Sequence, residues 1–409
     1  MPRLLTPRPV VPVSLNRARW AVTLIFFLHG LLFANWAARL PELELRYGIE
    51  HRELGQVLFC NAMGAWAAMP LASWLLPRFG SSRMTTIGAI LFCAFIPGLA
   101  LLDSVGQLMA LFLALGAATG LLDVAMNSQA IQVEQQYPRP IMSSFHAAFS
   151  LGGMLGAGAG ALGAHLGWNY ATHLLSFSVV GTVLALVAAS QLLPVVEAGS
   201  VPSQTAATPA TGLRWPSRLV VGLGIVAFCC MLGEGAMADW STIYLVQDTH
   251  ASSALAPLGY AAFSLAMATG RLLGDAAALR FGAQRLVVAG GLLALVGLLS
   301  LLVVPLTGVG IAGLFLIGLG LSTVIPTVFS ATGQQSDMAP AAALGMVSTI
   351  GYGGFLLGPP AIGWLADALT LRWALGIVAG LFVVLVAVGL TLRLASRPTA
   401  ARLEPVLVS

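Results

Sequence analysis

Long apolar runs without a single charged residue recur along the whole chain, and they constrain its fold more than any other feature. They occupy residues 54–77, 84–102, 104–122, 166–196, 338–366 and 373–392. Each run is long enough for a helix across a bilayer, which needs about 20 apolar residues. The longer run 286–336 is interrupted near Pro305 by turn-forming residues and predicts two helices. Together with the stretches 20–38, 219–246 and 257–279 and a helix that begins near Ile141, the sequence predicts an all-α integral membrane protein with twelve transmembrane helices.

The composition excludes most other classes of protein. Hydrophobic residues make up 58% of the 409 residues and charged residues only 8%, compared with about 25% charged residues in ordinary soluble domains. A soluble enzyme, a disordered regulator or a nucleic-acid-binding protein would need more polar surface. The four cysteines lie within apolar stretches, so they predict neither a disulfide framework nor a metal site.

The distribution of arginine predicts the orientation in the membrane. All 19 basic residues are Arg, and cytoplasmic loops of membrane proteins carry the excess of basic residues. If both termini are cytoplasmic, 14 Arg lie inside and four outside, while Arg271 falls within a span. The sequence therefore predicts a multi-pass protein of a bacterial inner membrane with both termini in the cytoplasm.

A polar stretch at mid-chain divides the sequence into two halves. It is rich in Ala, Pro, Ser and Thr, as linkers are. We expect a cytoplasmic N-terminal tail, a six-helix bundle, a cytoplasmic linker, a second six-helix bundle and a cytoplasmic C-terminal tail, over residues 1–19, 20–193, 194–217, 218–395 and 396–409.

The two halves contain related sequence motifs. RFGSSR at residues 78–83 and RFGAQR at residues 280–285 are 202 residues apart. Trp36 and Trp240 are 204 apart, and the Gly-Gly pairs at 152–153 and 353–354 are 201 apart. Two six-helix repeats in the same direction are typical of transporters in which two bundles rock about a central site.

These motifs resemble the major facilitator superfamily, whose members carry an Arg-x-Gly-x-x-Arg-like loop after the second helix of each half. The segments WAARLP at 36–41, DVAMN at 123–127, SSFH at 143–146 and EGAMADW at 234–240 look like a bacterial inner-membrane branch that includes a rhizopine-related permease and lies near sugar permeases. The resemblance implies two pseudo-symmetric bundles whose first, fourth, seventh and tenth helices line a central cavity. It also implies a sugar- or polyol-like solute.

The chain departs from the family pattern in two places. The acid that usually precedes the loop arginine is replaced by Pro77 and Leu279, and Asp275 lies a helical turn earlier. The fifth span lacks the Gly-Pro signature of drug–proton antiporters, since Gly358-Pro359 falls in the eleventh. We therefore expect altered gating by this loop and regard multidrug efflux as the less favoured alternative.

Three acidic residues lie inside predicted spans, where a charge costs about 2.5 to 3.5 kcal/mol and is a functional candidate. Glu234 is the leading candidate for proton coupling, followed by Asp123 and Asp239. Burial raises the proton affinity of a carboxylate, as a proton carrier requires. A structural hydrogen bond or ion pair is the alternative for each.

Five further residues are candidates for solute binding. Asn127 lies one turn after Asp123 on the same helix face. Asn35 and His29 are expected on a second cavity wall, while Trp36 and Trp240 could stack against a sugar ring. Each has a structural alternative, such as helix packing, a satisfied histidine or an aromatic belt.

Another group of residues is a candidate for controlling conformation. Arg271 and Asp275, four residues apart, are expected to form a gating contact near the inner face. The loop arginines Arg78, Arg83, Arg280 and Arg285 complete the predicted gates, and His146 is a candidate proton relay or a partner for a loop carbonyl.

The sequence lacks a nucleotide-binding loop, a nucleophile elbow and a metal-ligand spacing. It therefore predicts a monomeric, non-enzymatic secondary transporter without cofactor or metal, powered by a gradient. Proton coupling is favoured and Na+ is the alternative ion. Uptake of a small polar solute is favoured over efflux of drugs or metabolites, and a non-transporting membrane receptor with the same fold is the alternative from another class.

Overall fold

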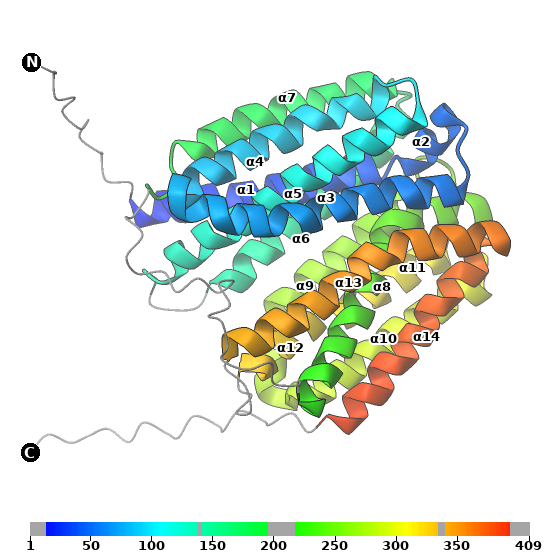
Figure 1. The fold of residues 1–409 in the computed structure, drawn as a ribbon. Coiled ribbons are helices and arrows are strands. Elements are labelled where there is room, and N and C mark those ends of the chain that lie inside the picture. Colours follow the sequence, from blue (N-terminus) through cyan, green and yellow to red (C-terminus); the bar gives the residue numbers. More distant parts are fainter. Residues whose placement is uncertain (1–13, 138–140, 195–216, 334–339, 393–409) are drawn as a thin grey trace, which may run out of the picture.

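The computed structural model describes residues 14–137, 141–194, 217–333 and 340–392. Over these residues the secondary structure is helical, with no β-strand. The helices form two bundles placed side by side (Figure 1). The predicted all-α membrane fold is confirmed.

The first bundle contains the helices of the N-terminal half. Its members are α1 (Leu15–Ala37), α2 (Leu40–Tyr47), α3 (His51–Phe79), α4 (Ser81–Phe95), the 3-10 helix η1 (Ile96–Ala100), α5 (Val105–Glu134), α6 (Met142–His165) and α7 (Tyr170–Ala189). The helix α2 is short and joins α1 to α3 at one end of the bundle, which we call the α2 end (Figure 1). The opposite end, where α1 and α8 begin, is called the terminal end.

The second bundle repeats most of this arrangement, but it has no helix equivalent to α2 or η1 in its described residues. Its members are α8 (Arg218–Asp248), α9 (Pro257–Phe281), α10 (Ala283–Val303), α11 (Thr307–Leu321), α12 (Val324–Gly333), α13 (Pro340–Ala368) and α14 (Leu371–Thr391). The segment equivalent to the continuous helix α5 is broken here into α11 and α12 at Ser322 and Thr323. The predicted linker and tails fall almost entirely on residues 1–13, 195–216 and 393–409, outside the described ranges.

Ten segments of the described chain are long and apolar enough to cross a membrane. One of them joins α4 to η1 and another joins α11 to α12. The helices α9 and α13, of 25 and 29 residues, are also long enough to cross and pack within the second bundle. Together they give the twelve membrane-crossing segments predicted from the sequence.

Polar residues fix where several of these helices begin. The side chains of Ser14, Ser104, Asn169, Ser217 and Thr370 each accept a hydrogen bond from a backbone N–H in the first turn of the helix that follows. Such caps satisfy donors that have no partner within the helix. The helix boundaries therefore follow local sequence as well as apolar run length.

The internal repeat is visible in backbone conformation. Gly80 and Gly282, 202 residues apart, both have φ of 83° and precede α4 and α10. Gly48 and His250 have the same separation and also share positive φ, at 60° and 54°. Only glycine adopts this region without steric cost. The RFGxxR motif thus marks a real structural repeat, in which the glycine makes the turn.

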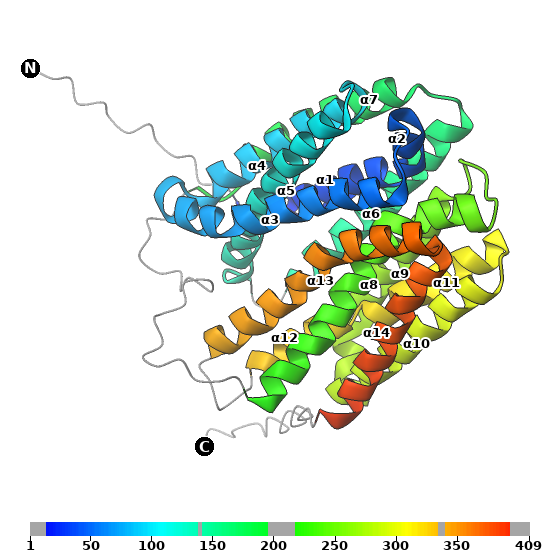
Figure 2. The same cartoon turned by 45° about the vertical axis from the view of Figure 1, so that its right-hand side comes forward.

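The two halves approach most closely near the α2 end. A Cβ atom added at Gly55 of α3 would lie 2.7 Å from the carbonyl oxygen of Pro359 in α13. Gly363, one turn further along α13, packs against the backbone of His51 and Gly55. From this contact the two helices diverge towards the terminal end (Figures 1 and 2). The structure is therefore closed at the α2 end.

Replacing Gly55 by leucine should open the α2 end, because the side chain cannot fit against the Pro359 carbonyl. Spin labels at the exposed residues Leu45 and Leu369 would report the separation of the halves there. We expect a longer distance in Gly55→Leu than in the parent. Gly106→Leu, at a glycine with open space around it, is the matched control, and equal distances in the two variants would contradict this assignment.

Candidate functional site

A charged pair lies in the middle of the second bundle. Arg271 Nη2 of α9 is 3.6 Å from Glu234 Oε2 of α8, and both side chains are 16% exposed. Cys230, one turn before Glu234, approaches its carboxylate at 3.6 Å. Arg271 is ten residues before the end of α9, about 15 Å along the helix axis. The pair therefore lies deep in the membrane-spanning region.

The same arginine also contacts the other bundle. Arg271 Nη1 donates a hydrogen bond of 2.8 Å to the hydroxyl of Ser150 in α6. His146 lies one turn before Ser150, and its ring packs edge-on against Phe26 of α1. Arg271 thus connects the carboxylate of one half to a helix of the other.

The position of Arg271 differs from the one expected, while its predicted gating role with Asp275 stays a prediction. We predicted a pair near the inner face from their four-residue spacing. The arginine instead points towards Glu234 and Ser150 at mid-membrane, because a counter-charge in a low-dielectric interior attracts it strongly. The side chain of Asp275 lies outside the described part of the structure.

A second polar group forms on α5. The amide nitrogen of Asn127 donates to the Asp123 backbone oxygen at 2.9 Å and to its carboxylate at 3.1 Å. The hydroxyl of Tyr352 in α13 also hydrogen-bonds with the Asp123 carboxylate. Asp123 and Asn127 therefore share a face, as their spacing indicates, and that face meets the second half of the molecule.

Asp239 differs from the other two carboxylates. It lies on α8 and is partly exposed, and in the described chain no hydrogen bond or ion pair reaches it. A carboxylate without a partner is costly within a membrane. Asp239 thus stays a candidate for proton coupling, a role that its position does not test.

Three predicted solute-binding residues are instead packed inside the first bundle. The ring of His29 lies between Phe92 and Phe149, Asn35 Nδ2 is 2.8 Å from His173 Nε2 of α7, and Trp36 packs edge-on against Phe112 of α5. Their exposures are 6%, 1% and 1%. These side chains face the interior of their own bundle in this conformation, and their predicted role in solute binding stays a prediction.

Trp240 is fully buried, and its predicted role in solute binding stays a prediction. It packs edge-on against His51 of α3, across the boundary between the halves. Trp36 makes no such contact, so the two tryptophans are not equivalent in environment despite their 204-residue separation. The fold repeats at 202 residues, and a shift of two residues places a side chain on a different helix face.

The loop arginines lie at the terminal end of the molecule. Arg78 stacks over Trp74 with its guanidinium 3.5 Å from the ring centroid, and Arg280 lies over Phe281. Arg83 and Arg285 are exposed. Among the described residues none of the four forms an ion pair. Their gating role therefore stays a prediction.

Sequence reasoning missed several residues that connect the halves. Ser150 and Tyr352 contact the charged residues described above. At the α2 end, the ring of His51 packs against Trp240 of α8, and the backbone nitrogen of Arg52 donates to Asp367 of α13 at 3.3 Å. No sequence motif marks these contacts between the halves, because the two partners in each are far apart along the chain.

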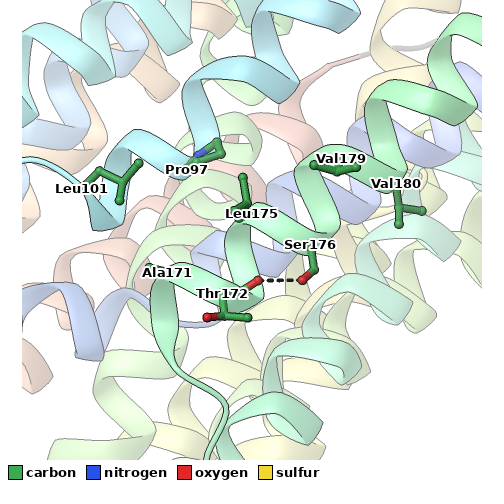
Figure 3. A pocket seen from close by; sticks show the side chains of 8 residues that line it. All are labelled: Pro97, Leu101, Ala171, Thr172, Leu175, Ser176, Val179 and Val180. Atoms are coloured by element: carbon green, nitrogen blue, oxygen red, sulfur yellow. Dashed lines mark hydrogen bonds between the residues drawn. The ribbon is translucent and has the colours of Figure 1, made fainter.

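A separate groove lies between η1 and α7 (Figure 3). The hydroxyl of Ser176 donates to the carbonyl of Thr172 in the same helix, so the groove offers little free polar capacity. Its lining residues are Pro97, Leu101, Ala171, Thr172, Leu175, Ser176, Val179 and Val180. None belongs to the mid-membrane polar groups.

Two helical bundles that meet around charged residues at mid-membrane define a polytopic membrane transporter. The family model described as Major Facilitator Superfamily matches residues 22–341 and, in a second match, residues 223–407. The chain belongs to the major facilitator superfamily and is a multi-pass membrane transporter.

Curated relatives agree with this assignment. The chain is 35% identical over 358 residues to an uncharacterized MFS-type transporter of Yersinia pestis, covering 87% of this chain and 91% of the relative. It is 34% identical over 364 residues to the uncharacterized transporter y4wD of Sinorhizobium fredii, covering 89% and 94%. It is 33% identical over 356 residues to the membrane protein MosC of Rhizobium meliloti, covering 87% and 85%. The predicted resemblance to this branch is confirmed.

Solved structures share the fold at low sequence identity. A point mutant of the nucleoside transporter NupG has a TM-score of 0.75 at 12% identity, covering 92% of this chain and all of that structure. A bacterial homologue of the human lysosomal transporter Spinster, inward-facing and occupied, has a TM-score of 0.68 at 14% identity, covering 93% and 98%. They establish the architecture alone.

Removing one member of the charged pair should destabilise the protein more than removing both. Arg271→Gln leaves the Glu234 charge without its counter-ion and should lower the free energy of unfolding by about 2 kcal/mol. In the double variant with Glu234→Gln, the loss should be smaller than in Arg271→Gln alone, because no uncompensated charge remains. Denaturant unfolding in detergent measures these differences, and additive losses would show that the pair is not coupled.

Proposed function

We propose that the protein is a secondary active transporter of a small polar organic solute, sugar- or polyol-like, and that it couples transport to protons. It acts as a monomer in the inner membrane, by alternating access. The observation that carries the proposal is the Glu234–Arg271 pair, in which the arginine also hydrogen-bonds with Ser150 of the opposite half.

This pair has the chemistry of a coupling site. With Glu234 ionised, the two charges neutralise each other, which lowers the cost of placing them in the membrane. A proton on Glu234 removes that balance and leaves the arginine charge to find another partner. Proton binding therefore changes the interactions of a residue that touches both halves.

The polar group on α5 is suited to bind the solute. The Asp123 carboxylate accepts hydrogen bonds, Asn127 offers both a donor and an acceptor, and the Tyr352 hydroxyl can do either. A polyol presents hydroxyl groups that match such a set. Because Tyr352 comes from α13 and the other two residues from α5, one ligand could contact both halves.

The direction of opening follows from the orientation predicted by the arginine distribution. That orientation puts the terminal end in the cytoplasm. Because the halves meet at the α2 end and diverge from there, this conformation would be inward-facing. Outward opening would then require separation of α3 and α13 around Gly55 and Gly363.

Proton coupling predicts that Glu234→Gln loses accumulation driven by a pH gradient. Because the amide cannot release a proton, net uptake should fall to the level of empty vesicles, while exchange of labelled for unlabelled solute continues. Proteoliposomes measure both, with a solute chosen by thermal-shift screening of sugars, polyols, amino acids and drugs.

The control is Asp103→Asn, which removes an exposed carboxylate and should transport as the parent does. Unchanged pH-driven uptake by Glu234→Gln would move the proton site elsewhere. The same vesicles separate the alternatives, since dependence on a sodium gradient indicates Na+ coupling and extrusion indicates efflux. A protein that binds solute without flux would be a receptor.

A further inference from the structure

Ser150 is the point at which the charged pair of the second bundle touches the first. Its side chain is 4% exposed, and its hydroxyl accepts the 2.8 Å hydrogen bond from Arg271 while lying 3.2 Å from the carbonyl of His146. The distance from Arg271 to Ser150 is shorter than the 3.6 Å to Glu234. The neutral hydroxyl is therefore the closer of the two partners of this guanidinium.

The helix that carries Ser150 is fixed to the rest of its bundle. Gly152 and Gly156 of α6 pack directly against the backbone of α1, at Phe27 and Leu31, and Gly30 of α1 packs against the backbone of Phe149. Helices in such contact leave no room for relative sliding, since even a methyl group would clash. Ser150 therefore belongs to a helix that is tightly packed against α1 of the first bundle.

The α6–α9 interface around this hydrogen bond is closely packed as well. Gly153 lies one turn from Ser150, and a Cβ atom added there would be 3.1 Å from the hydroxyl of Ser264 in α9. Ser264 precedes Arg271 by two turns of the helix. Movement of the halves against each other must therefore change the Arg271–Ser150 distance.

We propose that Ser150 is a positioning residue through which the charge on Glu234 controls the closure of the two halves. This inference rests on the proposed proton coupling. With Glu234 ionised, the carboxylate holds the Arg271 guanidinium in place to donate to Ser150, and this bond stabilises the conformation that is closed at the α2 end. A proton on Glu234 removes the opposite charge, Arg271 leaves its position, and the bond to Ser150 is lost.

Other titratable groups surround this contact and must be separated from Glu234. Cys230 of α8 approaches the Glu234 carboxylate, His146 of α6 and Tyr260 of α9 interact electrostatically with Arg271, and Tyr352 of α13 interacts with Glu234. Of these, His146 is the one whose ordinary titration falls near neutral pH. His146→Gln therefore belongs in the test.

The test measures the separation of the halves directly and requires no known solute. Spin labels are placed at Ile87 and Ala289, exposed and 202 residues apart on α4 and α10, in a Cys60→Ser background. On lowering the pH we expect the distance distribution to shift towards closure of the terminal end. Ser150→Ala should lose this shift, and Ser150→Thr, which keeps the hydroxyl, should restore it.

Matched variants separate positioning from packing. Ser264→Ala changes a hydroxyl at the same interface and should respond as the parent does. In His146→Gln, a retained shift assigns the pH response to Glu234, whereas a lost shift assigns it to His146 and overturns the inference. Glu234→Gln should show the low-pH distribution at every pH, which provides a result even if Ser150→Ala folds poorly. Adding Ser150→Ala to Glu234→Gln should cause no further change.

The inference is overturned if the parent shows no pH-dependent shift, if Ser150→Ala responds as the parent does, or if Ser150→Thr is as defective as Ser150→Ala. These results are independent of the vesicle assay. pH-driven uptake together with a normal response in Ser150→Ala would leave the proposed function intact and remove only the role of Ser150.

Discussion

Direct contact between helix backbones is the interaction on which the rest of this structure depends. Within a membrane the hydrophobic effect does not drive helices together, so their association relies on close packing. Glycine permits that packing within the first bundle, as between Gly116 and the backbone of Asn61 in α3. It also permits the contact between the halves at Gly55 and Gly363. Glycine therefore allows close backbone contact both within the first bundle and between the two bundles.

The few charged residues within the membrane-spanning region lie where the two bundles meet. Where side chains can rearrange freely, the loss of one ion pair is compensated by local movement of its neighbours. Here α8 and α9 hold Glu234 and Arg271 within one bundle, while α6 presents Ser150 from the other. A change of charge at this point therefore alters contacts in both bundles. In the proposed mechanism, this link allows a proton on Glu234 to affect the position of one bundle relative to the other.

The sequence predicted the architecture well and the site only in part. Span length, the RFGxxR repeat and the distribution of charge depend on local composition, so twelve helices in two related halves could be predicted. The pairing of Asp123 with Asn127 also followed from helical spacing. The inward orientation of Asn35, Trp36 and His29 could not be predicted, because nearly every face of these helices is apolar and periodicity does not distinguish a bundle interior from a cavity wall. Ser150 and Tyr352 were missed because their partners lie on helices distant in sequence.

The interruption between α11 and α12 gives the two halves a different helix continuity at equivalent positions. The continuous helix α5 has no such joint, whereas at Ser322 and Thr323 the ladder of backbone hydrogen bonds stops and starts again. The carbonyl of Leu321, just before the interruption, lies 3.8 Å from the sulfur of Cys230. Cys230 is one helical turn before Glu234, and its sulfur approaches the Glu234 carboxylate. The second half therefore contains an interrupted segment close to its acidic residue, whereas the equivalent segment of the first half is one continuous helix. The two halves therefore share one arrangement of membrane-crossing segments but differ in helix continuity at this position.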